Sequence, residues 1–176
     1  MSAGLLAVVF LVGFMIHEFD EIILIRRYLS QAENWKDPRG LFWRNRANYP
    51  SSGAIAMAIA EEFLLAGIFV GVAVFLDGPE MILGLLIPYC VHLIGHCGDA
   101  IIVKRWVPGS LTAVITLPIL LGAGWWFIAA QGAAWTWVVI WAVITTVVFV
   151  GNLQFMYKVI MPATQSWLNR VYSRPN

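Results

Sequence analysis

Five long apolar segments constrain what this chain can fold into more than any other feature of its sequence. A helix that crosses the hydrocarbon core of a bilayer needs about 20 predominantly apolar residues. The segments that meet this requirement are residues 3–26, 51–76, 80–103, 109–129 and 134–157. Of the 176 residues, 60% are hydrophobic and only 12% are charged. The sequence therefore predicts an all-α integral membrane protein, with residues 1–176 forming one transmembrane domain, a five-helix bundle.

The basic residues predict how these helices are oriented. If the helices alternate in direction, all eleven Lys and Arg residues fall on one side of the membrane, in the loops after the first and third helices and in the C-terminal tail. Cytoplasmic loops of membrane proteins carry an excess of Lys and Arg. The N-terminus is therefore expected outside and the C-terminus in the cytoplasm, with the protein in the inner or plasma membrane. The first segment has ionisable residues where a signal peptide would have its cleavage site, so it is expected to be a retained helix.

The loop of residues 26–50 is the only long connection that this pattern leaves. It mixes basic residues with Trp35, Phe42 and Trp43. Such a mixture favours a position along the cytoplasmic interface, where basic residues attract anionic headgroups and aromatic rings lie at headgroup depth. A partner-binding loop is the alternative.

Ionisable residues inside the apolar segments are the second unusual feature. Six acidic residues and all three histidines lie there: Glu18, Asp20, Glu21, Glu61, Glu62, Asp99, His17, His92 and His96. An acidic residue at the centre of a membrane helix costs about 2.5–3.5 kcal/mol on insertion scales, so such residues usually face the bundle interior and serve function. These nine residues predict a site inside the bundle.

Helical spacing predicts which of these residues share a face. His17 and Glu21 are at i and i+4, with Asp20 on the same face of the first helix. His92 and His96 have the same spacing on the third helix. Each helix can therefore present two ligands to one point.

The remaining acidic residues are placed by the same spacing. Glu18 is turned by about 100° from His17 and is expected at the edge of that face. On the second helix, Ala54 and Ala58 share a face with Glu62. Small residues mark close helix contacts, so Glu62 is the expected inward residue in preference to Glu61.

The polar residues of the three helices are expected at common depths in the membrane. Counted at about 1.5 Å per residue from the cytoplasmic end of each helix, His17, Glu62 and His92 all lie about 15 Å deep. On the same count, Glu21 and His96 both lie about 9–10 Å deep. Helices that run in alternating directions thus place their polar residues at two common levels, which predicts one site in the cytoplasmic half of the bundle.

These motifs and their order resemble the HXXEE family of small membrane proteins. "HEFDE", from His17 to Glu21, fits the motif that names the family, with Asp20 in place of the first glutamate. "AIAEE", which ends at Glu62, resembles its Ala-x-x-x-Glu element. "HLIGH" followed by "VPGSLT" is similar to its Asn-x-x-x-His and Pro-Gly elements, with His92 where Asn is usual and His96 at the family histidine. The resemblance implies a multi-helix membrane fold and no settled activity.

The residue types favour a metal site. Imidazole and carboxylate are ligands of zinc, non-haem iron and manganese. The expected ligands are His17, Glu21, Glu62, His92 and His96. Zinc is favoured over iron or manganese because it needs only three of these ligands, whereas iron pairs usually need more.

A metal in this position suggests hydrolysis. A divalent ion with an open coordination position lowers the pKa of bound water to about 7, which makes a nucleophile without any other cofactor. A metal-dependent hydrolase is therefore expected, with Glu21, Glu62 and Asp20 as its catalytic residues. Asp20, Asp99 or Glu61 could also orient the histidines by accepting a hydrogen bond from the ring nitrogen that does not bind the metal. A lipidic substrate is expected because a site within the bilayer is reached from the side.

Two other functions stay open at this point. In the first, His17 and the buried carboxylates perform metal-free acid–base chemistry on a lipid, as in membrane isomerases and cyclases. In the second, the polar residues form a proton or cation path or a structural hydrogen-bond network, although their common depth argues against a path.

The expected partners are membrane lipid and a lipidic small molecule. The chain has no glycine-rich phosphate loop and no basic stripe, so no nucleic acid partner is expected. Gly67 and Gly71 form a small-xxx-small pair that allows a homodimer.

Overall fold

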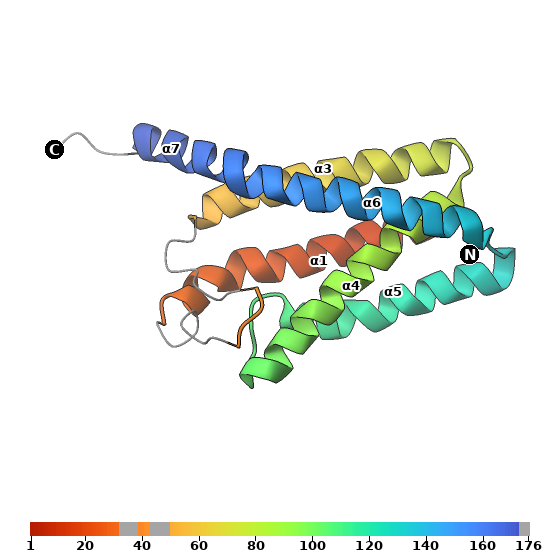
Figure 1. Ribbon diagram of the computed structural model, residues 1–176, viewed down its shortest axis with the longest axis horizontal. Coiled ribbons are helices and arrows are strands. Elements are labelled where there is room, and N and C mark those ends of the chain that lie inside the picture. The colour runs from red at the N-terminus through yellow and green to blue at the C-terminus, as the bar shows by residue number, and fades with distance from the viewer. Residues whose placement is uncertain (32–38, 43–49, 173–176) are drawn as a thin grey trace.

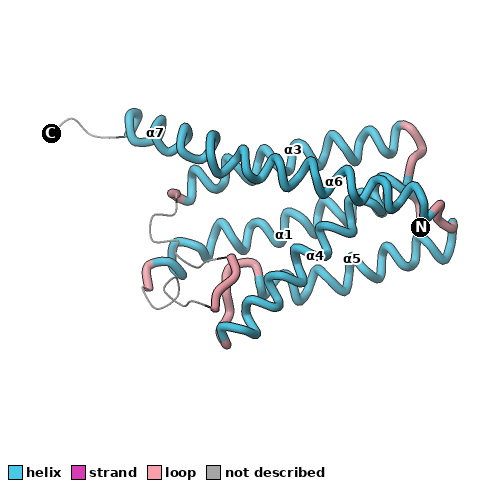
Figure 2. Tube along the Cα trace, in the orientation of Figure 1, coloured by secondary structure: helices cyan, strands magenta, loops and turns pink. Residues whose placement is uncertain are grey.

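Helices make up almost all of the structure, a computed structural model that describes residues 1–31, 39–42 and 50–172. The helices run along one another (Figure 1) and are joined by turns, with no strand in these ranges (Figure 2). In chain order they are α1 (Ala3–Leu29), α3 (Ser52–Phe75), α4 (Pro79–Val103), α5 (Ser110–Gln131), α6 (Trp135–Phe155), the π-helical turn η1 (Met156–Ile160) and α7 (Met161–Tyr172). The expected all-helical fold is thus confirmed for the part that is described. Trp35 and Trp43, expected at the membrane interface, lie outside it.

Four helices are long and apolar enough to cross a membrane. They are α3, α4, α5 and the continuous helix Trp135–Tyr172. The 27-residue helix α1 is not among these four, and its C-terminal half carries the HEFDE motif. The composition therefore supports a membrane protein with four apolar helices, one fewer than the five expected spans.

The last helix is longer than the sequence predicts. Instead of ending near residue 157, it continues through η1 and α7 to Tyr172. Pro162 is the second residue of α7, just after η1 ends, and it has no N–H to donate. A proline inside a helix also clashes with the carbonyl four residues earlier, and a π-helical turn widens the helix at that place. The helix therefore passes the proline without ending.

Helix α4 is the central element of the bundle. It runs obliquely across the bundle (Figure 1) and packs most extensively against α6 and α5, while α1 packs against α5 and α3. The crossing of α4 and α6 requires a glycine, because a Cβ on Gly84 would lie 2.5 Å from the Cβ of Trp141. Thr145 Oγ1 reinforces this crossing by donating to the Gly84 carbonyl at 3.2 Å. This arrangement brings the polar face of α4 against α1.

Candidate metal centre

Two pairs of ligands meet where α1 contacts α4. His17, Glu21, His92 and His96 each offer one nitrogen or oxygen atom within 4.8 Å of the others. His17 Nε2 lies 3.2 Å from His92 Nε2, and Glu21 Oε1 lies 3.0 Å from His96 Nε2 and 3.8 Å from His17 Nε2. In a tetrahedral zinc site with bonds of about 2.0–2.1 Å, ligand atoms are about 3.3–3.4 Å apart. The spacing of these four side chains therefore fits a metal ion.

The second nitrogen of His96 shows why its Nε2 is available as a ligand. His96 Nδ1 lies 3.0 Å from the carbonyl oxygen of Pro108. A carbonyl oxygen only accepts, so Nδ1 carries the proton and, in a neutral imidazole, Nε2 carries the lone pair. Nε2 is buried and has no hydrogen-bond partner among the described residues, although Glu21 Oε1 is 3.0 Å away. The two atoms are close enough for an ion pair, but they do not form a hydrogen bond with each other. A cation held by both atoms would satisfy them.

His17 is held in the same way by Thr112 of α5. His17 Nδ1 lies 3.3 Å from Thr112 Oγ1. The hydroxyl proton goes to Asp20 Oδ2, at 3.0 Å, or to the Gly109 carbonyl, at 3.2 Å. Its oxygen is then the acceptor for His17 Nδ1–H, which leaves the lone pair on Nε2. Asp20 therefore contacts His17 through Thr112, in the outer position that carboxylates commonly take behind a metal-binding histidine.

Gly109 allows the backbone to lie directly against the ligands. Its φ of 84° is in the left-handed region. A Cβ at this position would lie 2.7 Å from His96 Nδ1, 2.9 Å from Glu21 Oε1 and 2.9 Å from His17 Cε1. Sequence reasoning noted the Pro-Gly element only as a resemblance and did not assign Thr112 at all. The signal for both was the "VPGSLT" stretch at the start of α5.

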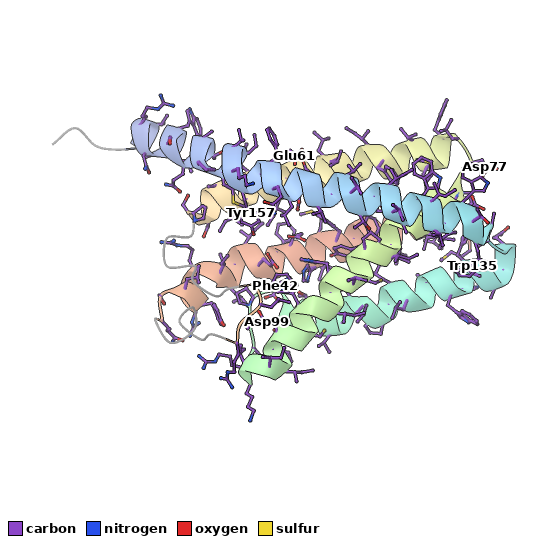
Figure 3. The ribbon with its side chains drawn as sticks, in the orientation of Figure 1. Phe42, Glu61, Asp77, Asp99, Trp135 and Tyr157 are labelled. Atoms are coloured by element: carbon purple, nitrogen blue, oxygen red, sulfur yellow. The ribbon has the colours of Figure 1, made fainter. Side chains whose placement is uncertain are left out.

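Phe42, which the sequence predicts at the membrane interface, is half-buried and lies against the ligands. The buried carboxylate of Asp99 accepts the backbone N–H groups of Leu41 at 2.8 Å and Phe42 at 3.2 Å (Figure 3). The Phe42 ring then stacks on His96, with centroids 4.2 Å apart and planes 6° apart. Gly95 leaves room for it, since a Cβ there would lie 2.9 Å from Phe42 Cζ. Asp99 thus positions the Phe42 ring against His96 by holding the backbone of Leu41 and Phe42.

A cavity of about 220 Å³ lies beside the four ligands. Glu21, His92 and His96 form part of its wall, and so does Glu62 of α3, which is not one of the four grouped residues. Most of the remaining wall is apolar. Glu61 instead accepts a hydrogen bond of 2.9 Å from Asn152 Nδ2 on α6, and Figure 3 shows it where the two helices pass.

Glu18, expected at the edge of the His17 face, is buried and lines the cavity. Its exposed fraction is 6%. The bundle surrounds α1 on more than one side, so a residue turned by about 100° is also buried. Glu18 therefore belongs to the site.

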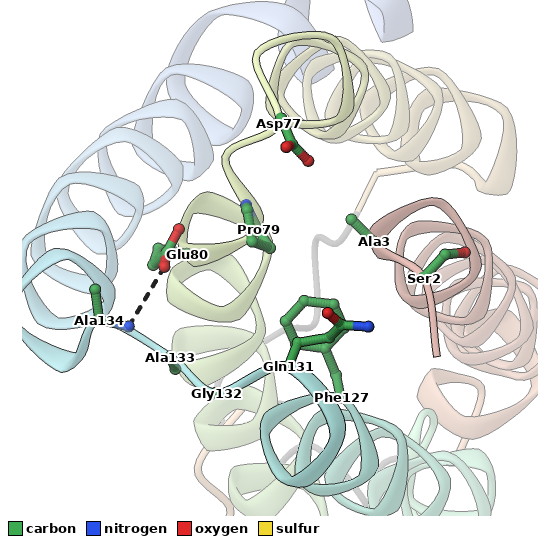
Figure 4. Close-up of a pocket in the computed structure, with 10 residues that line it drawn as sticks. All are labelled: Ser2, Ala3, Asp77, Pro79, Glu80, Phe127, Gln131, Gly132, Ala133 and Ala134. Carbon is green, nitrogen blue, oxygen red and sulfur yellow. Dashed lines mark hydrogen bonds between the residues drawn. The ribbon is translucent and has the colours of Figure 1, made fainter.

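A second cavity, of about 730 Å³, lies at the other end of the bundle (Figure 4). The turns α3–α4 and α5–α6 and the start of α1 surround it, and Glu80 Oε1 accepts the Ala134 N–H there at 3.3 Å. Among the described residues no histidine or cysteine lines this cavity, and its polar side chains are those of Ser2, Asp77, Glu80 and Gln131.

The fold and the site define an all-helical protein with four helices able to cross a membrane and a buried His/Glu centre. The chain belongs to the family described as "Protein of unknown function with HXXEE motif", whose model matches residues 8–123. The match runs from α1 into α5 and includes the four grouped ligands, and it confirms the resemblance seen in the sequence. No curated protein and no solved structure is detectably similar to this chain.

Proposed function

We propose that this protein is an integral membrane metalloenzyme that hydrolyses a lipidic substrate. The observation that carries the proposal is the convergence of Nε2 of His17, His92 and His96 with the carboxylate of Glu21. The Nδ1 atoms of His17 and His96 are engaged by Thr112 and Pro108, so the inward nitrogens are free to bind a metal. Metal-binding histidines in proteins are oriented by this kind of outer contact.

Zinc is the metal that the donor set fits best. Three imidazoles and one carboxylate offer nitrogen and oxygen donors within 4.8 Å of one another, and zinc accepts such donors. If three of these four side chains held a zinc ion, the fourth position would be left for water, which the ion would activate as a nucleophile near neutral pH. Glu62, on the cavity wall beyond the four ligands, is in a position to accept the proton or to serve as a further ligand.

Helix α1 is part of the membrane domain in this proposal, as the fifth span. It packs between α3 and α5, both of which are apolar enough to cross a membrane. Its residues His17 and Glu18 are buried in the bundle, as is usual for ionisable groups inside a membrane, whereas Arg26 and Arg27 in its last turn are exposed. The distribution of Lys and Arg favours an external N-terminus and a cytoplasmic C-terminus, in the inner or plasma membrane.

The cavity supports a lipid as the substrate. Its wall is formed largely by apolar side chains from α1, α3, α4 and α6, and a smaller number of polar side chains, among them Glu21, His92 and His96, also line it. Ligand sites that are mainly apolar with a few convergent polar groups bind molecules of the same character. A lipid in the leaflet would need no aqueous path to this position.

Elemental analysis tests the proposal directly. Protein purified without a chelator and without a metal-affinity tag is expected to contain close to one zinc per chain. His17→Ala and His96→Ala should each lose most of it, because removal of one ligand leaves an incomplete coordination shell. The same preparations, compared by gel filtration and thermal unfolding, show whether the variants remain folded.

The result that would contradict the metal centre is wild-type protein that is folded and free of metal. Metal-free acid–base chemistry would then be the better proposal. The buried carboxyl group of Glu18 on the cavity wall is the observation that favours this second function.

A further inference from the structure

Helices α3 and α6 both line the cavity, yet their backbones do not pack closely against each other. Helix α3 packs against α1, α7, α4 and η1, whereas α6 packs chiefly against α4. On the α6 side of the cavity, Thr146, Val150 and Leu153 form part of the wall although their side chains are exposed. These residues therefore lie at the edge of the cavity, between its interior and the surface of the bundle. We call the line between α3 and α6 the lateral seam.

Side chains join the two sides of the lateral seam at its ends. At one end, the rings of Phe69 on α3 and Trp141 on α6 meet at nearly right angles, with centroids 5.7 Å apart. At the other end, Ala58 of α3 lies in a buried cluster with Met156 and Met161. At about 1.5 Å per residue, Ala58 and Phe69 are about 16 Å apart along α3. A stretch of seam of this length thus lies between the two contacts.

A hydrogen bond crosses the seam between these ends. Asn152 Nδ2 donates to Glu61 Oε2 at 2.9 Å, and Figure 3 shows Glu61 where the two helices pass. Neither residue is part of the cavity wall, but each adjoins one that is, namely Glu62 on α3 and Leu153 on α6. The bond therefore lies on the outer side of the wall. Hydrogen bonds between membrane helices are modest in strength, so this one can break and form again.

The interior of the cavity has an apolar end and a ligand end. Phe14 and Phe10 lie one turn and two turns before His17 on α1, and Tyr89 of α4 packs against both rings, with centroids 5.3 Å and 5.4 Å away. All three aromatic rings line the cavity. A molecule that lies along the cavity would place an apolar part against these rings and its reactive part beside the ligands.

The size of the cavity limits what it can enclose. About 220 Å³ corresponds to about seven water molecules at about 30 Å³ each. Pockets for drug-sized ligands are larger, at about 300–1,000 Å³. A flexible hydrocarbon chain can enter such a space with one part of its length, whereas the fused rings of a sterol would have to enter together.

The surroundings of the seam indicate where such a chain comes from. Both α3 and α6 are apolar enough to cross a membrane. Their exposed residues near the seam include Leu64 and Ile68 on α3 and Val143 and Val147 on α6. The seam is therefore continuous with the apolar outer surface of the bundle, against which the hydrocarbon chains of membrane lipids would lie.

We propose that one hydrocarbon chain of a membrane lipid enters the cavity through the lateral seam and lies against Phe10, Phe14 and Tyr89. The hydrogen bond between Glu61 and Asn152 closes the seam once the chain is inside. The inference rests on the proposed function for the position of the bundle in the membrane, and it names a lipid with a linear chain as the substrate class.

Photolabelling of the protein in lipid nanodiscs tests the chain site. The probe is a hexadecanol that carries a diazirine at the end of its chain, and mass spectrometry identifies the labelled residues. Label is expected on Phe10 and Phe14, which are only 1% and 4% exposed and which lipid outside the bundle does not reach. No label on these two residues, together with normal labelling of the exposed residue Ile115 on α5, would overturn the proposal.

Competition tests the linear chain. Excess unlabelled hexadecanol is expected to remove most of the label from Phe10 and Phe14, and cholesterol at the same concentration is expected to leave it. Equal suppression by cholesterol would contradict the choice of a linear chain.

A cross-link across the seam tests the route. Glu61→Cys and Asn152→Cys are combined in a background with Cys90→Ser and Cys97→Ser and joined by a short bifunctional methanethiosulfonate. The bridged protein should lose most of the label on Phe10 and Phe14, and a reductant should restore it. Each single cysteine variant, treated with the same reagent, is the matched control and should keep the label. Full labelling of the bridged protein would show that the chain enters elsewhere.

Two substitutions test the hydrogen bond itself. Asn152→Leu keeps the size of the side chain and removes the donor, so we expect Phe10 and Phe14 to be labelled about threefold faster, the factor that an average interhelical hydrogen bond contributes. Glu61→Gln keeps an acceptor oxygen for Asn152 and should be labelled at the wild-type rate. Equal rates in the two variants would show that the bond does not close the seam.

The outcomes for the chain site and for the metal centre can be distinguished, because photolabelling requires neither metal nor turnover. Elemental analysis of the same samples reports the metal. Protein that holds zinc but shows no label on Phe10 and Phe14 overturns the chain site alone. Metal-free protein that is labelled there overturns the metal centre alone.

Discussion

For His17 and His96, the residue that contacts Nδ1 decides which ring nitrogen carries the proton. His96 Nδ1 faces the carbonyl of Pro108 and His17 Nδ1 faces the hydroxyl of Thr112, so both rings present Nε2 inward. Glu21 Oε1 lies 3.0 Å from His96 Nε2 without a hydrogen bond. A pair of acceptors this close, in a buried place, is the strongest single indication that a cation belongs there.

Thr112 offers a test at this scale. Thr112→Val keeps the shape of the side chain but leaves His17 Nδ1 without an acceptor and removes the hydroxyl donor to Asp20. Loss of such an outer contact typically lowers metal affinity about 10–100-fold. We expect a loss in this range, measured by competition against a zinc chelator of known affinity.

Thr112→Ser retains the hydroxyl and is the matched control, with affinity expected to stay close to that of the wild type. If the Val and Ser variants bound zinc equally well, the hydroxyl would have no part in holding His17.

At the scale of elements, the turn between α4 and α5 completes the site. Lys104 ends α4 in the left-handed conformation, with a φ of 58°. Ser110 then closes the turn, since its hydroxyl donates to the Val107 carbonyl at 2.6 Å and accepts the Val107 N–H at 3.0 Å. The closed turn presses Pro108 and Gly109 against the ligands from α1 and α4.

Gly109→Ala should therefore damage both the turn and the metal centre. The alanine would have to adopt the positive φ of Gly109. Its Cβ would lie within 3.0 Å of atoms of His96, Glu21 and His17. Overpacking of this kind costs about 1–3 kcal/mol. We expect a lower temperature of thermal unfolding and a loss of most bound zinc by elemental analysis.

Gly122→Ala is the control for this change, because Gly122 lies within helix α5 and a Cβ there would meet nothing within 4 Å. It should keep the metal. Full zinc content in Gly109→Ala would show that the ligands do not lie against the turn in the working protein.

For the whole molecule, the site depends on how the bundle sits in the membrane. The four ligands lie on α1 and α4, two helices that the apolar helices α3, α5 and α6 surround. Helix α6 contributes Val150 and Leu153 to the cavity wall, and its exposed residues are mostly apolar. The orientation of this bundle decides from which leaflet the proposed lipidic substrate would enter.

Cysteine labelling tests the expected orientation. In a background with Cys90→Ser and Cys97→Ser, Gln131→Cys at the exposed C-terminal end of α5 should react with a membrane-impermeant maleimide in intact cells. Asn169→Cys on α7 should react only after the membrane is permeabilised, since the basic loops and tail favour the cytoplasm. The reverse pattern would place the site in the opposite leaflet.

The sequence alone determined the features that depend on local spacing. Apolar length and composition predicted the helices, because a helix is defined by residues near one another along the chain. The i, i+4 spacing paired His17 with Glu21 and His92 with His96, and these pairs meet in the structure. The order of the motifs identified the family.

Only the tertiary structure decided what surrounds these pairs. Thr112 lies 95 positions after His17 in the chain, and Phe42 reaches His96 because Asp99 holds a loop that precedes it by 57 positions. Glu18 looked peripheral by rotation about a single helix, but neighbouring helices enclose it. Contacts of this range depend on how helices cross and on where a Cβ is missing, as at Gly84 and Gly109. No local pattern encodes those crossings, because they are set by packing between elements.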